Sequence, residues 1–190
     1  IDSAGADLTL AAVTANGFAL TLDGGPTGVI DLASLSAAGT TGALQVTDSQ
    51  TTTLGSAGVV NATTVTLLDT TNTGTNGITF ANDTTIDSLV TGGLPFNLAF
   101  TGTTNTIGGD TTLGNTGRFT VNSTTTTFTG GLDTRNAAGG TFLSGTLATA
   151  GAGQMDLGAT TLNGTTTLNS GTGAINVASV AGAAQTLNLQ

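Results

Sequence analysis

The residues of this chain that could carry out chemistry are few and nearly all of one kind. All eleven acidic residues are Asp, the only cations are Arg118 and Arg135, and His, Cys, Lys, Glu, Trp and Tyr are absent from the 190 residues. Acid–base and nucleophilic catalysis rely mainly on imidazole, thiol, amine and carboxyl groups, and of these only carboxyl groups occur here. We therefore expect no enzymatic activity, no cofactor and no tightly bound metal.

Pairs of carboxylates are the arrangement that could still support hydrolysis of a polysaccharide. A glycoside hydrolase needs two carboxyl groups facing one cleft, and the pairs to consider are Asp83 with Asp87 and Asp110 with Asp133. The only aromatic residues are seven Phe, so no Trp or Tyr is present to stack on a sugar ring. A polysaccharide-binding or polysaccharide-degrading module is therefore the alternative function, not the leading one.

Two further patterns have a chemical and a plain structural interpretation. Arg118 and Arg135 would suit a β-helical polysaccharide lyase, but a surface ion pair with Asp110 or Asp133 is the simpler expectation. Gly-Gly-Asp at 108–110 is a single partial match to the tandem nonapeptides of calcium-binding β-rolls, which favours an ordinary Asp-capped turn.

Modification of surface Asn residues is a further possibility. Asn-x-Ser/Thr sequons, the acceptors for N-glycosylation, occur at Asn61, Asn82, Asn122 and Asn163. A chain this rich in Asn and Thr contains such triplets by chance, so they are retained only as possible glycosylation sites.

Thr-rich tracts occur at 51–54, 71–75, 123–129 and 164–168. Flat arrays of Thr-x-Thr on one face of a solenoid are used by ice-binding proteins, and those arrays repeat strictly at one position of the coil. The tracts here differ in length, and we expect many of them at turns. The sequence therefore does not favour an ice-binding array.

The elements that must position these residues are short strands. The 45 Thr and 30 Gly make up over a third of the chain, and both residue types are poor in helices. Alternating apolar residues recur two apart, as in 18–23, 43–48 and 96–100, which is the strand period. Between these runs lie Asn-Gly pairs and Gly, Asp and Thr clusters that are typical of turns. The sequence predicts an all-β fold with frequent turns.

The strands repeat at a fixed long spacing. Leu98 and Phe100 are followed 21 positions later by Phe119 and Val121, and Val121 is followed at the same interval by Phe142. Such a period indicates a solenoid, here a parallel β-helix of about nine coils of roughly 21 residues. Levels stacked at roughly 4.8 Å would make a rod of roughly 43 Å, as one segment over 1–190. The residues predicted to point inward are Leu98, Phe100, Phe119, Val121, Phe142, Met155, Leu157, Ile175 and Val177, and Thr and Asn are expected to cover the outside.

Charge and hydropathy exclude several partners. A formal charge of −9 with two Arg provides no surface to neutralise phosphates, so we expect no nucleic acid and no anionic lipid as partner. The apolar runs are too short to span a bilayer, and the first residues do not resemble a signal peptide. Because the sequence starts at Ile1 and stops within a strand pattern, we expect it to be an interior piece of a longer repetitive protein.

Three stretches carry a resemblance that extends in style over nearly the whole chain, at 74–89, 119–132 and 158–179. Their low-complexity mixture of Thr, Asn, Gly and Leu resembles the repeats of filamentous-haemagglutinin-type bacterial surface proteins, including two-partner-secreted adhesins and autotransporter-type β-strand repeat proteins. The resemblance implies a right-handed parallel β-helix that folds outside the cell. It also implies a long adhesive or filament-forming stalk, and some relatives are glycosylated on sequons of this kind.

From these observations we expect a structural or adhesive rod at the bacterial cell surface, or secreted, which spans distance and presents surface for attachment. Terminal strand patterns at 1–10 and 186–190 lack the Pro or Lys residues that protect an exposed sheet edge. The expected partners are neighbouring coils of the same chain or identical subunits stacked end to end. Host or bacterial surface glycans or proteins are the expected targets of adhesion.

Overall fold

The computed structural model describes residues 1–36, 42–68 and 77–190, and all regular structure in these ranges is β-strand. The strands are β1 (Leu8–Thr14), β2 (Leu20–Leu22), β3 (Val29–Ser36), β4 (Leu44–Val46), β5 (Thr51–Leu54), β6 (Val60–Leu67), β7 (Ile78–Phe80), β8 (Thr84–Thr91), β9 (Leu98–Phe100), β10 (Thr104–Ile107), β11 (Asp110–Thr112), β12 (Phe119–Phe128), β13 (Gly131–Asp133), β14 (Thr141–Thr149), β15 (Met155–Asn169), β16 (Ile175–Ala181) and β17 (Leu187–Leu189). The described ranges contain no helix that could cross a membrane.

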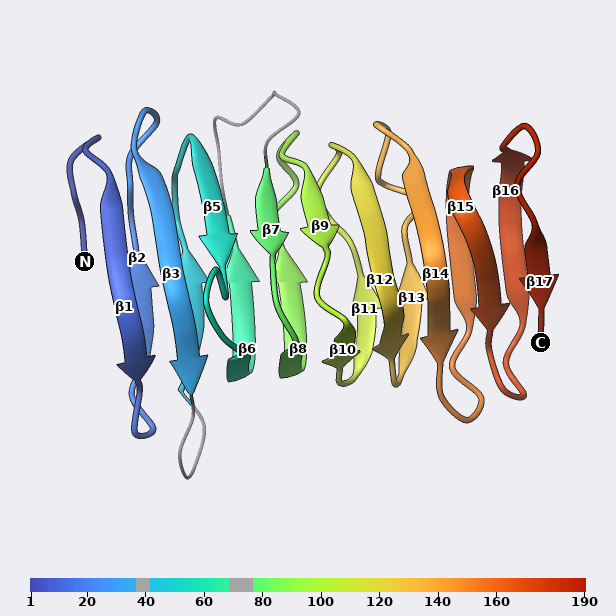
Figure 1. Ribbon diagram of the computed structural model, residues 1–190, viewed down its shortest axis with the longest axis horizontal. Coiled ribbons are helices and arrows are strands. Elements are labelled where there is room, and N and C mark those ends of the chain that lie inside the picture. The colour runs from blue at the N-terminus through green and yellow to red at the C-terminus, as the bar shows by residue number, and fades with distance from the viewer. Residues whose placement is uncertain (37–41, 69–76) are drawn as a thin grey trace.

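The chain winds as a right-handed parallel solenoid. In Figure 1 the near strands run downward and the far strands upward while the chain advances from left to right, which is a right-handed coil. One column of paired residues starts at Leu8 and Ile30, passes through Phe119 and ends at Val180. This column contains about eight turns of about 21 residues. The predicted β-helix of about nine coils is therefore confirmed.

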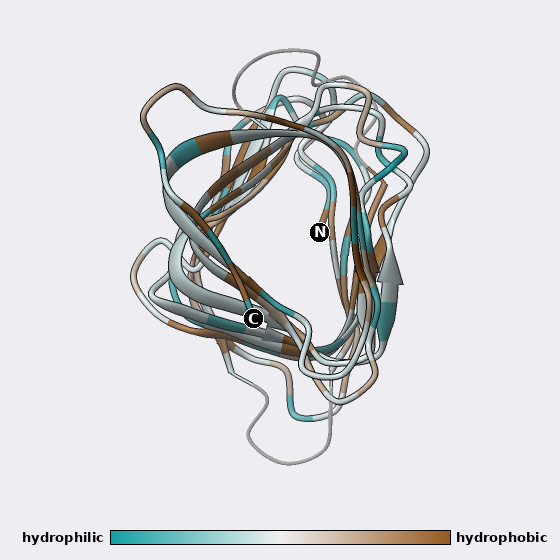
Figure 2. Cartoon of the chain, turned by 90° about the vertical axis from the view of Figure 1, so that its right-hand side faces the viewer, coloured by the Kyte–Doolittle hydropathy of each residue, from teal (hydrophilic) through white to brown (hydrophobic). Residues whose placement is uncertain are grey.

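Each coil has three sides, which we call faces A, B and C, and the view along the axis shows the closed outline (Figure 2). Face A contains β5, β7 and β9 with the first parts of β1, β3, β12 and β14, the middle of β15 and the end of β16. Face B contains β10 and β17 with the second parts of β1, β3, β12, β14 and β15 and the first parts of β6 and β8. Face C contains β2, β4, β11 and β13 with the second parts of β6 and β8 and the first parts of β15 and β16. The long strands therefore turn a corner and serve two faces.

The core is a continuous apolar column inside these faces. The predicted recurrence is confirmed where Leu98 pairs with Phe119 and Phe100 with Val121 on adjacent levels. The rings of Phe80 and Phe100 are stacked with centroids 4.7 Å apart, and Phe128 meets Phe100 edge-on at 6.0 Å. Stacked levels therefore bring like side chains together, which buries apolar surface that one coil alone would expose.

One residue of the predicted inward set is wrong. Val121 pairs with Leu143, which is buried, and Phe142 pairs with Thr120 on the outer side of face A. The turn before β14 contains one residue more than the 21-residue period assumes, so the alternation brings Leu143 inward. The outward ring of Phe142 is covered by the Arg118 guanidinium, 4.1 Å from the ring centroid.

The interior also contains polar residues that the sequence analysis placed outside. Thr84, Asn105 and Thr126 occupy successive inward positions on face B and are buried. Asn105 Nδ2 donates to Thr126 Oγ1 at 3.1 Å, and Ser123 Oγ and Thr126 Oγ1 lie 2.7 Å apart in a further hydrogen bond. The hydrogen bonds between these groups offset the cost of burying the Ser123 and Thr126 hydroxyl groups.

Candidate functional site

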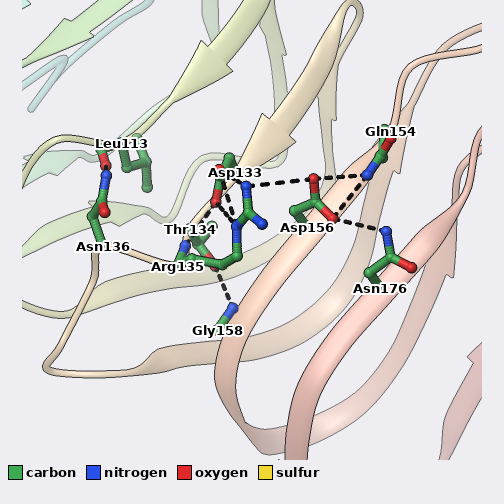
Figure 3. A network of polar contacts seen from close by, with 9 residues as sticks. All are labelled: Leu113, Asp133, Thr134, Arg135, Asn136, Gln154, Asp156, Gly158 and Asn176. Carbon is green, nitrogen blue, oxygen red and sulfur yellow. Dashed lines mark hydrogen bonds and ion pairs between the residues drawn. The ribbon is translucent and has the colours of Figure 1, made fainter.

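A cluster of charged and amide side chains lies on the outside of face C. Asp133 of β13 pairs in register with Asp156 of β15, and Asp156 pairs with Asn176 of β16. Arg135, two residues after Asp133, and Gln154, two before Asp156, complete the cluster, which we call the polar ladder (Figure 3). Because alternate strand residues face outward and levels stack in register, three consecutive levels present these side chains side by side.

Arg135 neutralises the first carboxylate of the polar ladder. Its Nη2 lies 2.6 Å from Asp133 Oδ2, and its Nε lies 3.0 Å from Oδ1 and 3.1 Å from Oδ2. The backbone N–H of Arg135 also donates to Asp133 Oδ1 at 2.9 Å. The ion pair predicted between Arg135 and one of two Asp residues is therefore formed with Asp133.

The second carboxylate is held mainly by amides. Gln154 Nε2 donates to Asp156 Oδ1 at 2.9 Å and to Oδ2 at 2.8 Å, and Asn176 Nδ2 donates to Oδ1 at 2.8 Å. Arg135 Nη2 is 3.9 Å from Asp156 Oδ2 and so lies between the two acids. Like charges on adjacent levels repel each other, and these donors offset that repulsion.

The titration of the acids follows from these contacts. The side-chain hydrogen bond from Arg135 lowers the pKa of Asp133, against an opposing effect of partial burial. The hydrogen bonds from Gln154 and then Asn176 lower the pKa of Asp156, and the hydrogen bond and charge of Asp133 raise the pKa of Arg135. Both carboxyl groups are therefore ionised at neutral pH. The general acid of a glycoside hydrolase needs the opposite, a raised pKa.

A shallow pocket of about 360 Å³ lies between Arg135, Gln154, Asp156 and the β16 segment Asn176–Ala178. The side chain of Arg135 lies at the edge of this pocket and is 62% exposed. The pocket therefore offers amide, carboxylate and guanidinium groups to a small polar ligand. Its volume is at the low end of the range for ligand pockets in proteins.

The loop after β13 is tied to the levels on both sides. Asn136 Nδ2 donates to the Leu113 carbonyl at 3.0 Å, and the Gly158 N–H donates to Thr134 Oγ1 at 3.2 Å (Figure 3). The Thr134 hydroxyl is also 2.8 Å from that of Thr141. The residues that follow β13 therefore form a fixed corner of the coil.

The other carboxylates considered for chemistry lie on strands and corners of the solenoid. Asp87 lies four residues after Asp83, at the corner where β8 passes from face B to face C. Asp83 Oδ1 accepts the Thr104 N–H at 2.8 Å. Asp110 pairs with Gly131, so Asp133 lies diagonally from it on the next level and is already engaged by Arg135.

The remaining site residues from the sequence have ordinary surroundings. Gly-Gly-Asp at 108–110 leads into β11, and the described ranges contain no group of three or more acidic residues that could hold a metal ion. Arg118 stacks on Phe142 and Arg135 pairs with Asp133, so each Arg has its own partner.

The sequons lie on strands and corners of the solenoid. Asn61 is on the outer side of β6 and is half-buried, and Asn82 follows β7 and donates to the Gly55 carbonyl at 2.9 Å. Asn122 in β12 and Asn163 in β15 are exposed. Glycosylation of these residues stays a prediction.

Gln154 and Asn176 were not found as site residues from the sequence. Asn176 follows Asp156 by 20 positions, as Ile175 follows Met155, so the repeat that located the core also contained this signal. Applying that interval to the polar residues would have placed Asn176 beside Asp156.

Comparisons with models of known families, with curated proteins and with solved structures find no match to this chain.

Proposed function

We propose that the chain is a structural and adhesive rod of a filamentous bacterial surface protein, located outside the cell. The observation that carries the proposal is the unbroken pairing of faces A and B from β1 to the last strands. Each coil adds about 4.8 Å to the length and pairs only with its neighbours. Such an architecture builds length and repeated surface, which are what a stalk requires.

The repetitive surface supports the adhesive part of the proposal. The outer positions are mainly Thr, Asn and Ala, and they are arranged in straight rows along the axis. Rows of identical groups favour multivalent contact with cell-surface glycans or proteins, because many weak contacts form together. Attachment to such surfaces is the expected role of the rod.

The ends of the described coil support axial continuation. Leu8, Leu10 and Val13 at the first level, and Ile175, Val177 and Leu187 at the last, pack on the core but are only partly buried. Backbone groups at a sheet edge pair readily with a further strand. We propose that these edges are covered by further coils of the same polypeptide or by identical subunits stacked end to end.

One experiment separates the rod from other shapes and functions. Beads coated with the purified chain are tested for attachment to bacterial and epithelial cells, and small-angle X-ray scattering measures the cross-section of the particles in solution. A constant narrow cross-section with cell attachment above that of albumin-coated beads is expected. A cross-section that fits a compact sphere, or attachment equal to that of albumin, would contradict the proposal.

The pocket of the polar ladder favours a second candidate, recognition of a polysaccharide. Its amides and carboxylate could hydrogen-bond sugar hydroxyls, while Arg135 could pair with a uronic acid. Co-sedimentation with insoluble polysaccharides would be compared between the wild type and Asn176→Ala, with Gln45→Ala on the same face as a matched control. Retention that only Asn176→Ala abolishes would support this function, and equal retention of all three proteins would refute it.

A further inference from the structure

Face B presents two straight rows of Thr on its outer side, which we call the Thr lattice. The first row runs in register through Thr104, Thr125, Thr146 and Thr167, one residue on each of four consecutive levels. The second row, two residues further along each strand, runs through Thr85, Thr106 and Thr127 and continues as Ala148 and Asn169. The strict repetition at one coil position that the sequence analysis did not find is therefore present.

The spacing of the Thr lattice is set by the sheet. Neighbouring levels are about 4.8 Å apart, and residues i and i+2 of one strand, such as Thr125 and Thr127, are about 6.7 Å apart. The register shifts of β12 and β14 fall before these rows, between Asn122 and Thr125 and between Leu143 and Gly145, so the rows themselves continue without offset. The branched β-carbon of Thr restricts χ1, which holds the hydroxyl groups in a fixed pattern.

The hydroxyl groups of the Thr lattice are free to bind something outside the chain. None of the seven Thr side chains hydrogen-bonds to another of the described residues. The inward Thr residues of the same strands differ, because Thr84, Thr126 and Thr166 each have a hydrogen-bonding partner. The unpaired hydroxyl groups of these Thr residues therefore lie on the outer surface of the strands.

The other two faces lack such a lattice. On face A, the corresponding outer row is interrupted by Asp31 and by Phe142. On face C, the row contains Gln45 and Val90 and then the charged polar ladder. The Thr lattice contains no charged residue in either row, so its chemical character is uniform over the levels from β10 to β15.

We propose that the Thr lattice is an ice-binding surface. Each Thr presents a methyl group beside a hydroxyl that can donate and accept, so a flat array can order water and merge with its hydrogen-bonded network. The two repeats of the lattice, about 4.8 Å and about 6.7 Å, arrange the hydroxyl groups as a regular two-dimensional array that an ordered layer of water molecules can meet. Many identical weak contacts in one plane then act together. This activity goes beyond that of a stalk and would attach the rod to a crystalline surface.

The test uses the whole chain and two Lys substitutions. Thr125→Lys places a long charged side chain in the centre of the Thr lattice, and Thr79→Lys places the same side chain on face A between Thr53 and Ala99. Each protein is partitioned between liquid and a slowly growing ice hemisphere, and thermal hysteresis is measured. Circular dichroism melting checks that the three proteins fold alike.

We expect the wild type and Thr79→Lys to be concentrated in the ice and to show thermal hysteresis, and Thr125→Lys to lose both. Exclusion of the wild type from ice would overturn the proposal, as would equal losses in the two variants. Retention of the wild type on crystalline cellulose or chitin with no effect on ice would also overturn it, in favour of a polysaccharide surface.

A gain-of-function variant keeps the proposal testable if Thr125→Lys does not fold. Ala148→Thr supplies the missing hydroxyl of the second row between Thr127 and Asn169. The Thr lattice predicts larger thermal hysteresis for Ala148→Thr than for the wild type at the same concentration. Unchanged or smaller thermal hysteresis in a folded Ala148→Thr protein would count against the lattice as the binding surface.

Discussion

Replacing one of two Phe residues tests how the solenoid is stabilised. Phe100 is completely buried, stacked on Phe80 with centroids 4.7 Å apart and edge-on to Phe119 at 6.3 Å and Phe128 at 6.0 Å. Truncating a buried Phe to Ala costs about 3–5 kcal/mol of unfolding free energy. The aromatic contacts place Phe100→Ala in the upper part of that range, because each adds about 0.5–1.5 kcal/mol beyond area burial.

Phe142→Ala is the matched control, since it removes the same atoms from the outer side of face A. Its main contact is the Arg118 guanidinium at 4.1 Å, and an exposed cation–π pair contributes about 0.5–1 kcal/mol. For a chain of this length 1 kcal/mol corresponds to about 2–4 °C in Tm. Phe100→Ala should therefore lower Tm by about 8–20 °C, and Phe142→Ala by about 4 °C at most.

Melting followed by circular dichroism, together with urea titration, measures both variants. A solenoid unfolds as coupled neighbouring levels, so Phe100→Ala should also broaden the transition by weakening the middle of the rod. Equal losses of Tm in the two variants would refute the assignment of Phe100 to the core and Phe142 to the surface. A larger loss for Phe142→Ala would do the same.

The remaining predictions concern the polar ladder and the backbone. Because the pKa of Asp133 is lowered in the fold, its stabilising contribution is complete above its ordinary value near 3.8 and is lost as the pH falls through the lowered value. The Tm difference between wild type and Arg135→Gln should therefore be small but measurable at pH 6 and diminish as the pH falls below 3.8 and through the lowered pKa, and a constant difference would argue against the ion pair. Gly145 has φ +89°, and a Cβ there would lie 1.9 Å from the Ser123 carbonyl oxygen, so Gly145→Ala should prevent folding or reduce the urea midpoint severely. Gly151 has φ +58° with no atom within 4 Å of its Cβ position, so Gly151→Ala should cost only about 1–2 kcal/mol by urea titration.

Much of the core could be predicted from the sequence because its apolar residues repeat at two intervals, every second residue along a strand and about every 21 residues between coils. Leu98, Phe100, Phe119 and Val121 alternate along their strands and recur after 21 residues, so both the inward direction and the partner on the next level could be inferred. Phe142 was assigned wrongly because it is adjacent to Leu143 and only one of two neighbouring residues can face inward. The extra residue in the preceding turn decides between them, and turn length is weakly constrained by composition.

The polar sites were harder to predict because Thr can occupy either side of a strand. The first row of the Thr lattice recurs at intervals of 21 residues from Thr104 to Thr167, so its period was present in the sequence. The composition of the tract at 123–129 nevertheless predicts a turn when the repeat is not considered. In the structure this tract lies in β12 and the corner that follows β12. Asn176 of the polar ladder was missed for a related reason, since it lies 20 residues after Asp156 and contacts it only when the two coils stack.

The sequence by itself indicated an all-β fold, strands that repeat about every 21 residues and apolar columns that form a narrow core, because the preferences of Thr and Gly and the two-residue alternation act locally. Only the tertiary structure decided which Thr of a run faces inward. The four consecutive Thr residues at 124–127 give no pattern that shows which of them faces inward. The register of β12 with β10 and β14 turns Thr126 toward the core and leaves Thr125 and Thr127 outside. A shift of one residue in that pairing would exchange the two sides of the strand. The Thr lattice therefore exists because neighbouring levels impose the register.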